Sequence, residues 1–452
     1  MSDWNGQTID QLRGALARGE TTSTRLTETC LERIAALNPR LNAFITVTAE
    51  AALAAALAAD RTRAAGTPVG ALHGIPLSLK DLIDQAGVRT TAGSQVRRDV
   101  VATRHATITT RLEAAGAVLV GKTNLHEFAF GTTNDDSGFG GARHPLDDTR
   151  SPGGSSGGSA IAVRTGMSIA SIGTDTGGSI RIPAGVCGVV GFKPEWGDIP
   201  SDGVVPLSRQ LDHVGPLART VTDAWLVYET LAGRAPGSTD RLEPLPLKGL
   251  RFGLLTGYFD TRIAGDVRAG VAAAVEHLAR AGAVIEPVEI PHATDIGPVY
   301  LHLVLGDAAA YHAATLERRP GDYTPPVRLR LEMARYLLAE DYARALRGRE
   351  VIAGEIDRAL EGRVALLCPT LPVTAPPIGA ATVPVGEGEE AVRNAMLRFT
   401  QPFNVGRQPA LSLPCGVSAT GLPIGLQIVG ARGAATLLLR AAAACEQVVT
   451  GT

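Results

Sequence analysis

The spacing of apolar residues predicts helices at the start of the chain. Over residues 26–37, apolar side chains recur every three to four positions, which is the period of an amphipathic helix. The hydroxyl run Thr21–Ser23 can cap the start of this helix, and Pro39 is expected to end it. An alanine-rich segment at 49–65 predicts a second helix. We therefore expect residues 1–70 to be mostly helical.

From residue 71 onward, short apolar runs that predict strands alternate with helical patterns. Strands are predicted at 74–80, 117–120, 251–255, 283–288, 364–368, 410–413 and 423–429. Helices are predicted at 105–115, where Gly116 is the stop signal, across most of 220–345, and from about residue 434. Alternation of this kind predicts a layered α/β domain.

Two glycine-rich stretches, 131–159 and 173–188, interrupt the regular pattern. Loops of this length inside a compact domain usually carry function. No internal repeat, low-complexity tail or flexible linker divides the chain. We expect one domain over residues 1–452, composed of an N-terminal helical segment (1–70), a core (71–215), a helical region on the substrate side (220–345) and a C-terminal return to the sheet (364–452).

Composition excludes several classes of protein. The formal net charge is -2 and hydrophobic residues make up 45%, so neither a nucleic-acid partner nor a disordered chain is expected. No uninterrupted apolar run reaches about 18 residues, which argues against a membrane-spanning helix. The polar start, Met1–Asp10, carries no sign of a secretory leader, so a cytoplasmic location is expected.

The cysteines and histidines give no indication of a disulfide or a metal site. The five cysteines are odd in number, far apart and never spaced as C-x-x-C, and the nine histidines form no H-x-x-x-H pair. We expect buried thiols in a reducing compartment, no metal and no cofactor.

Lysine is scarce in this chain. Of the 43 basic residues, only four are lysine, namely Lys80, Lys122, Lys193 and Lys248. Where arginine is the general choice of cation, a retained lysine can mark a position that needs an amine.

Residues Gly116–Thr123 match the phosphate-binding pattern G-x-x-x-x-G-K-[ST] letter for letter. A phosphate loop must follow a strand and keep its amides free for the anion. Here the four intervening residues are apolar and themselves read as the strand. A nucleotide site is therefore disfavoured, and Lys122 is expected to end a core strand.

Residues Gly153–Gly157 match G-x-S-x-G, the nucleophile elbow of α/β-hydrolases. The elbow needs a strand immediately before it, whereas residues 147–152 read as a loop. Histidines that could complete a Ser-His-Asp triad are present, but each reads more simply as a surface or core residue. This triad is also disfavoured.

A larger constellation is more specific. Two Gly-Gly-Ser units, ending at Ser155 and Ser179, lie 24 residues apart with a helix and a strand predicted between them. Paired glycines let backbone amides approach a ligand closely, as an oxyanion hole requires. A serine nucleophile also needs a base, and Lys80 at the polar end of an apolar strand is the best candidate when no histidine qualifies.

These residues resemble the amidase signature family of serine hydrolases, whose triad is Ser-cisSer-Lys. The resemblance covers most of the chain and is densest from Leu72 to Gly215. The motifs that carry it include Gly121–Asn124, Glu127–Gly131, Gly188–Pro194, Asp212–Pro216, Phe399–Asn404 and Gly421–Gly430.

The resemblance implies a single large α/β/α layered domain with a mixed central sheet flanked by helices, and it implies roles for particular residues. Ser179 is implied to be the nucleophile, Ser155 the bridging serine after a cis Gly154–Ser155 peptide, and Lys80 the base. The implied oxyanion hole consists of the backbone amides of Thr176, Gly177, Gly178 and Ser179. The segment that lines the family's acyl pocket corresponds to Ala129, Phe130 and Gly131.

Two positions depart from the family pattern. His126 stands where relatives often carry Asp, and Glu195 follows Lys193-Pro194 where a small hydroxyl residue is usual. Neither residue is expected to touch the triad.

The resemblance implies a stand-alone hydrolase that acts on a carbon–nitrogen bond other than a peptide bond, in an amide, an aryl amide or a related ester or carbamate. The alternative is the amidase subunit of a tRNA-dependent amidotransferase, which hydrolyses glutamine and passes ammonia to a partner. The family's glutamine site uses an Asp shortly before the Phe-Thr of the late motif, and Met396–Thr400 contains no acid. A non-enzymatic scaffold is a third class, which the intact Lys80, Ser155 and Ser179 disfavour.

The expected partner is a small molecule, and the chain is expected to act as a monomer or homodimer. Phe130 and several residues of the helical region favour a fairly apolar pocket that accepts aryl groups, namely Tyr300, Leu301, Leu305 and Tyr311. The alternative is that these side chains belong to the core.

Overall fold

A mixed sheet of eleven strands runs through the computed structural model, which describes residues 6–234, 236–237 and 240–451. In their order across the sheet, the strands are β1 (Phe44–Val47), β3 (Val118–Thr123), β2 (Pro76–Lys80), β4 (Ala170–Asp175), β6 (His213–Ala218), β5 (Val190–Lys193), β12 (Ala410–Val417), β13 (Pro423–Val429), β9 (Ala365–Pro369), β7 (Arg251–Leu255) and β8 (Val284–Val288). The pairs within β3–β2–β4 and β9–β7–β8 are parallel, and the strands between these groups pair antiparallel. A separate hairpin pairs β10 (Thr382–Val385) with β11 (Gly388–Ala391).

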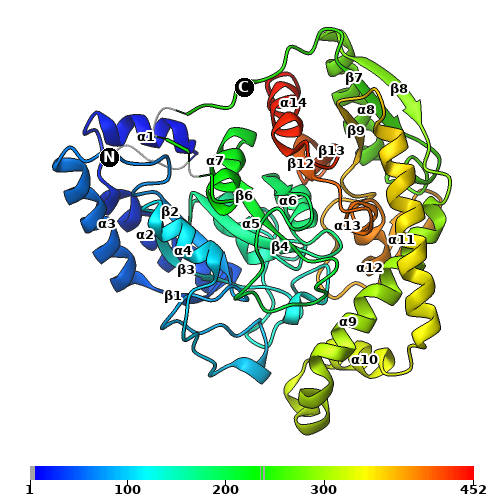
Figure 1. Ribbon diagram of the computed structural model, residues 1–452, viewed down its shortest axis with the longest axis horizontal. Helices are drawn as coiled ribbons and strands as arrows, with labels where there is room; N and C mark the ends of the chain where they lie inside the picture. The colour runs from blue at the N-terminus through cyan, green and yellow to red at the C-terminus, as the bar shows by residue number, and fades with distance from the viewer. Residues whose placement is uncertain (1–5, 235, 238–239, 452) are drawn as a thin grey trace.

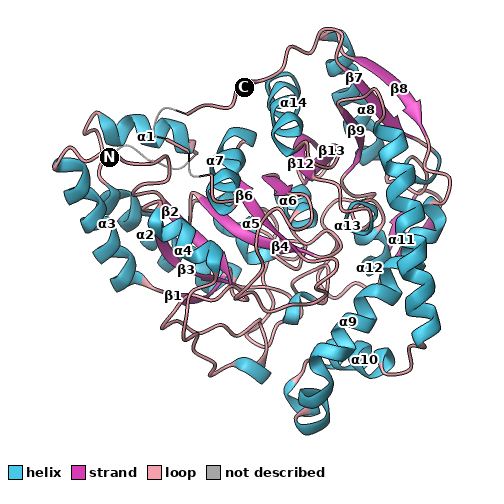
Figure 2. Cartoon of the chain, viewed as in Figure 1, coloured by secondary structure: helices cyan, strands magenta, loops and turns pink. Residues whose placement is uncertain are grey.

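Helices flank this sheet, as Figures 1 and 2 show. Within the described residues, the α-helices are α1 (Ile9–Ala17), α2 (Ser23–Leu41), α3 (Ala49–Ala64), α4 (Thr107–Ala114), α5 (Gly157–Thr165), α6 (Arg181–Cys187), α7 (Val221–Leu231), α8 (Gly265–Arg280), α9 (Ile296–Arg318), α10 (Pro325–Ala334), α11 (Ala339–Leu360), α12 (Val392–Leu397), α13 (Pro402–Val405) and α14 (Ala435–Val449). The long α9 and α11 pack against each other at the right of Figure 1, with α10 beside them. The layered α/β fold with a mixed sheet is as predicted.

The strands beneath the helices are buried along their whole length. Every residue of β2, β3, β4, β5, β6, β9 and β13 is buried. Strands that are covered on both faces need apolar residues throughout instead of strict alternation, which explains the short apolar runs of the sequence. The edge strand β8 is only partly buried.

The predicted start of α2 is confirmed, but its predicted stop is wrong. The Thr22 hydroxyl accepts a hydrogen bond from the Arg25 amide at 3.0 Å and caps the helix. Pro39 lies inside the last turn, so the helix continues past it although the ring supplies no N–H donor. The helix ends at Asn42, which adopts a left-handed φ of 49° and donates from its amide to the Asn38 carbonyl.

Two features near the glycine-rich stretches were missed. In the stretch 173–188, residues 176–180 form a loop and Gly188 a turn, because β4 extends to Asp175 and α6 spans Arg181–Cys187. Strands β5 and β6 were not predicted, because Gly191 in the first and the Gly215-Pro216 pair in the second weaken their strand propensity. Pairing with neighbouring strands outweighs that propensity.

No α-helix among the described residues has the length and apolar character needed to cross a membrane. Residues 1–5, which include half of the segment on which the absence of a leader was predicted, lie outside the described residues.

Candidate active site

The ends of two parallel strands bring the predicted triad residues to one edge of the sheet. Lys80 is the last residue of β2, and β4 is its parallel neighbour. Ser179 lies in the loop that joins β4 to α6, and Ser155 lies two residues before α5. The helix and strand predicted between the two Gly-Gly-Ser units are α5 and β4.

Lys80 lies fully buried at this edge. Its Nζ atom donates to Ser155 Oγ at 2.8 Å and to Thr174 Oγ1 at 2.8 Å. Burial lowers the pKa of Lys80 to about 7, although the nearby carboxylates of Asp175 and Asp212 oppose that shift. A substantial fraction of the amine is therefore neutral near neutral pH. Thr174, whose hydroxyl is the second acceptor for the amine, was not predicted from the sequence.

The Gly154–Ser155 peptide is cis, as the resemblance implies. The loop is held by backbone hydrogen bonds from the Gly154 amide to the Thr132 carbonyl at 2.7 Å and from the His126 amide to the Ser155 carbonyl at 3.1 Å. His126 therefore contacts Ser155 through its backbone amide, while its imidazole, the group that departs from the family pattern, lies by Asn134 and Asp136. Glu195 lies elsewhere and accepts from the Gly433 amide.

Ser156 joins the two Gly-Gly-Ser loops. Its amide donates to the Ser179 carbonyl at 3.2 Å and its hydroxyl to the Thr174 carbonyl at 3.1 Å. Within the described residues, no hydrogen bond links the hydroxyls of Ser155 and Ser179. The Lys80–Ser155 contact is therefore formed and the second contact of the implied relay is not; catalytic hydrogen bonds often tighten only when substrate binds.

The loop of residues 176–179 presents backbone amides without protein acceptors. None of the four amides donates a hydrogen bond within the described part of the chain. Gly178 has a φ of 145°, and a Cβ there would lie 2.2 Å from Thr400 Oγ1. A Cβ on Gly177 would lie 2.5 Å from the Tyr300 hydroxyl. The glycines are required by crowding as well as by backbone conformation.

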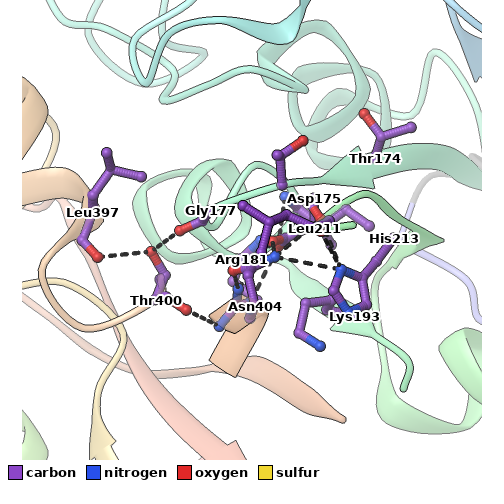
Figure 3. Close-up of polar contacts among 12 residues, drawn as sticks. Thr174, Asp175, Gly177, Arg181, Lys193, Leu211, His213, Leu397, Thr400 and Asn404 are labelled. Carbon is purple, nitrogen blue, oxygen red and sulfur yellow. Dashed lines mark hydrogen bonds and ion pairs between the residues drawn. The ribbon is translucent and has the colours of Figure 1, made fainter. Parts of the chain in front are cut away.

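A buried ion pair holds the base of this loop (Figure 3). Arg181 Nη2 lies 2.9 Å from Asp175 Oδ1, and Asp175 Oδ2 accepts from the Ile180 amide at 3.1 Å. Arg181 Nη1 donates to the Thr400 carbonyl at 2.8 Å, and the Thr400 hydroxyl donates to the Gly177 carbonyl at 2.7 Å. The ion pair thus ties the C-terminal part of the chain to the loop.

Asn404 supplies further hydrogen bonds to the buried Asp175. Its Nδ2 donates to the Asp175 carbonyl at 3.0 Å and to Asp175 Oδ1 at 2.8 Å. Burial alone would raise the pKa of Asp175, but Arg181 and Lys193 hold it well below its usual value. His213 hydrogen-bonds through Nδ1 to the same carbonyl, and burial lowers the pKa of its imidazole, which stays neutral. None of these partners was predicted.

Asp212 supports the loop from the other side. It accepts from the Thr176 hydroxyl at 2.6 Å and from the amides of Leu207 and Ser208. Burial raises the pKa of this carboxyl to about 6. A second carboxylate, besides Asp175, is thus within electrostatic range of Lys80.

The predicted acyl-pocket segment includes a residue with a positive φ, and two arginine side chains lie over its phenylalanine ring. Ala129 has a φ of 58°, and a Cβ on Gly131 would lie 2.0 Å from the His126 ring. Phe130 is buried, and the guanidinium carbons of Arg330 and Arg393 lie 5.8 and 5.7 Å from its ring centroid. No sequence pattern distinguishes either arginine from the many others in the chain.

The predicted apolar wall is not assembled as expected. Tyr300 lies against Gly177, but the side chains of Leu301 and Tyr311 are 43% and 40% exposed. A cavity of about 730 Å³ lies beside Tyr311 and Phe128, and its lining includes three arginines, Arg97, Arg318 and Arg319. None of the predicted triad residues lines this cavity.

The other lysines have structural positions. Lys122 was expected to end a core strand, but β3 continues by one residue to Thr123; its amine forms a buried ion pair with Asp81 at 3.2 Å. Lys193 donates to the Gln408 carbonyl at 2.6 Å, and Lys248 is exposed. The five cysteines are free thiols, and within the described residues no group of three His, Cys, Asp or Glu side chains is arranged to hold a metal ion.

Comparison with known proteins assigns the chain to the amidase family, whose model matches residues 25–439. A glutamyl-tRNA(Gln) amidotransferase subunit of Roseiflexus sp. (strain RS-1) is 39% identical, over 98% of this chain and 96% of its own. A crystal structure described as an amidase superposes with a TM-score of 0.91 at 38% identity, covering 97% of this chain and 98% of the other. The corresponding glutamyl-tRNA(Gln) amidotransferase subunit from Thermotoga maritima superposes with a TM-score of 0.81 at 32% identity, covering 99% and 96%.

This chain belongs to the amidase family, and it is a carbon–nitrogen hydrolase of the amidase signature type.

Replacing Arg181 with Met should destabilise the protein strongly. The change leaves Asp175 buried without its cation, which typically costs about 3–5 kcal/mol. Denaturant unfolding measures the loss. The control is Arg280→Met, which removes an ion pair to Glu276 whose side chains are 67% and 61% exposed, and should cost under about 1 kcal/mol. Equal losses for the two variants would show that the buried pair does not have this stabilising role.

Proposed function

We propose that this chain hydrolyses a carbon–nitrogen bond of an amide or carbamate through an acyl-enzyme on Ser179. The observation that carries the proposal is the buried Lys80 amine, which hydrogen-bonds to Ser155 at 2.8 Å beside the loop that carries Ser179. The same loop offers the amides of residues 176–179, which no protein acceptor uses in the described chain. The proposed base, bridging hydroxyl, nucleophile and oxyanion donors thus all lie at one edge of the sheet.

The reaction begins with proton transfer along the relay. Neutral Lys80 accepts a proton from Ser155 while Ser155 accepts one from Ser179. Ser179 Oγ attacks the substrate carbonyl carbon, and the amides of residues 176–179 donate to the developing oxyanion. The proton returns through the relay to the leaving nitrogen, which departs as the acyl-enzyme forms. Water then attacks the ester through the same relay and releases the acid.

The remaining features follow from this assignment. The segment formed by Ala129, Phe130 and Gly131 would line the acyl pocket. The substrate would be a small molecule, and the 1–452 chain would act as one domain, as a monomer or homodimer, in a cytoplasmic setting. No metal or cofactor takes part in any of these steps.

A second candidate is the glutaminase subunit of a tRNA-dependent amidotransferase, with partner subunits. It is favoured by the curated relative that is 39% identical over nearly the whole chain. The late motif argues against glutamine, because Met396–Thr400 contains no acid, and the side chain that lies beside Gly177 is the apolar Leu397. Arg398 is directed elsewhere and stacks on Tyr258, with its guanidinium carbon 4.2 Å from the ring centroid.

Replacing Ser179 with Ala should reduce turnover at least about a thousandfold, because the attacking oxygen is lost. Intact mass spectrometry should also find no adduct with a fluorophosphonate probe. The matched control is Ser159→Ala, which removes a buried hydroxyl that contacts Thr123 Oγ1 and should leave labelling intact. A labelled Ser179→Ala protein would refute the assignment of the nucleophile.

The rate should depend on pH through the Lys80 amine. Since the ammonium form cannot accept a proton, kcat/KM of the wild type should rise as pH increases through about 7 and then level off. Lys80→Arg should be as inactive as Lys80→Ala, because a guanidinium does not deprotonate. A flat profile from about pH 5 to 9, or activity restored by Arg, would mean that position 80 needs only a cation.

Ammonia release separates the two candidate functions. The chain alone should hydrolyse L-glutamine at least about tenfold less efficiently than an amide that lacks the ammonium group, because burying that group without a partner is costly. A coupled ammonia assay measures the rate of hydrolysis of each of the two amides. Preference for glutamine would support the amidotransferase reading instead.

A further inference from the structure

The cavity of about 730 Å³ that lies outside the proposed triad has an aromatic floor. Phe128, His312 and Tyr323 line this cavity, and all three side chains are buried. The Phe128 ring meets the His312 ring edge-on, with centroids 4.4 Å apart, and its centroid lies 5.6 Å from that of Tyr323. Tyr311 packs edge-on against the same imidazole at 4.8 Å. Several rings that converge on one cavity favour a planar, aromatic ligand.

Hydrogen bonds to neighbouring residues hold this floor in place. Thr324, which follows Tyr323, donates to Glu127 Oε2 from its amide at 2.8 Å and from its hydroxyl at 2.6 Å. The Phe128 amide donates to the Ala92 carbonyl at 2.8 Å. The two rings are therefore positioned before any ligand binds, and a preformed site loses less conformational entropy on binding.

One imidazole nitrogen in the floor has no partner. His312 Nδ1 hydrogen-bonds to the Tyr323 hydroxyl at 3.0 Å, whereas the buried Nε2 has no hydrogen-bond partner among the described residues. Burial lowers the pKa of His312 to about 4, so the imidazole is neutral at neutral pH. Buried polar atoms normally find a partner, so this nitrogen indicates a polar group on the ligand. A phenolic hydroxyl suits either tautomer of the ring, because it can both donate and accept.

Two arginines bring positive charge to the same cavity. Arg97 lies in η1 (Gln95–Arg97) and Arg318 at the end of α9, and both line the cavity. Each donates through Nε to a backbone carbonyl, that of Thr90 at 3.1 Å and that of Ala314 at 3.1 Å. Neither has a carboxylate partner within the described part of the chain. Both guanidinium groups can therefore bind an anion.

The third arginine of the lining, Arg319, joins two walls of the cavity. Its Nε donates to Asp322 Oδ2 at 2.5 Å, and its Nη1 donates to the Val96 carbonyl at 3.2 Å. This charge is thus already balanced. Among the described lining residues none is acidic, so the two remaining arginines leave the cavity positive.

We propose that this cavity binds an aromatic carboxylate that carries a ring hydroxyl, of which 4-hydroxybenzoate is a simple example. The ring lies on the aromatic floor, the hydroxyl bonds to His312 Nε2, and the carboxylate binds Arg97 and Arg318 through charge-assisted hydrogen bonds. Because none of the proposed triad residues lines the cavity, this is a second ligand site, which goes beyond the proposed function and does not depend on the chemistry of Ser179.

Isothermal titration calorimetry of the wild type tests the site with three probes, namely 4-hydroxybenzoate, benzoate, which lacks the hydroxyl, and phenol, which lacks the carboxylate. 4-Hydroxybenzoate should bind at least about threefold more tightly than benzoate, as for one hydrogen bond between neutral groups. It should bind at least about tenfold more tightly than phenol, because charge-assisted hydrogen bonds are stronger. The Kd should stay the same after Ser179 has reacted with the fluorophosphonate and in Ser179→Ala, because the cavity is separate from the triad.

Three variants test the individual contacts. His312→Phe keeps an aromatic ring but removes Nε2, so it should abolish the preference for 4-hydroxybenzoate over benzoate. Arg97→Gln and Arg318→Gln should each weaken binding of 4-hydroxybenzoate about threefold to tenfold. The matched control is Arg328→Gln, because Arg328 is 46% exposed on α10 and pairs with Glu332, and this variant should bind as the wild type does.

The second site would be overturned if the wild type failed to bind 4-hydroxybenzoate or if Arg97→Gln and Arg318→Gln both bound it as tightly as the wild type. Loss of binding after Ser179 has been labelled would also overturn it, because the ligand would then occupy the catalytic site. An unchanged preference in His312→Phe would contradict the hydroxyl contact that defines the ligand. None of these results affects the proposed function, which depends on turnover and on the labelling of Ser179 itself.

Discussion

The buried ion pair between Asp175 and Arg181 is the interaction on which the candidate site depends. A buried charge pair is tolerated only when its remaining donors and acceptors are satisfied. Here the Arg181 guanidinium also donates to the Thr400 carbonyl, Gln427 Oε1 and Asn404 Oδ1. The pair therefore joins the end of β4, the start of α6 and the C-terminal part of the chain, and the loop that carries Ser179 lies between the two charged residues.

The state of Lys80 depends on the same part of the core. Full burial favours its neutral form, and the carboxylates of Asp175 and Asp212 limit the shift so that the amine titrates near neutral pH. Without Arg181, the negative charge of Asp175 would no longer be balanced by the guanidinium, and it would raise the pKa of Lys80 further. The pair that fixes the loop geometry thus also sets the electrostatic surroundings of the proposed base.

Local sequence patterns were sufficient to predict part of the candidate site and most of the fold. Lys80 could be selected because it is one of four lysines and ends an apolar strand, and Ser155 and Ser179 because paired glycines precede both. Thr400 and Asn404 belong to the motif Phe399–Asn404, but their contacts with Arg181 could not be predicted, since they lie more than 200 residues from it and no local pattern links them. Arg330 and Arg393 were hidden by the abundance of arginine, and strands β5 and β6 by the glycines and proline within them.

A crystal structure of the protein after reaction with a phosphonate ester would test the central claim most directly. The account predicts phosphorus bonded to Ser179 Oγ, with the phosphonyl oxygen within hydrogen-bonding distance of amides in residues 176–179 and Lys80 Nζ still bonded to Ser155. An adduct on another residue, or a phosphonyl oxygen directed away from these amides, would contradict it.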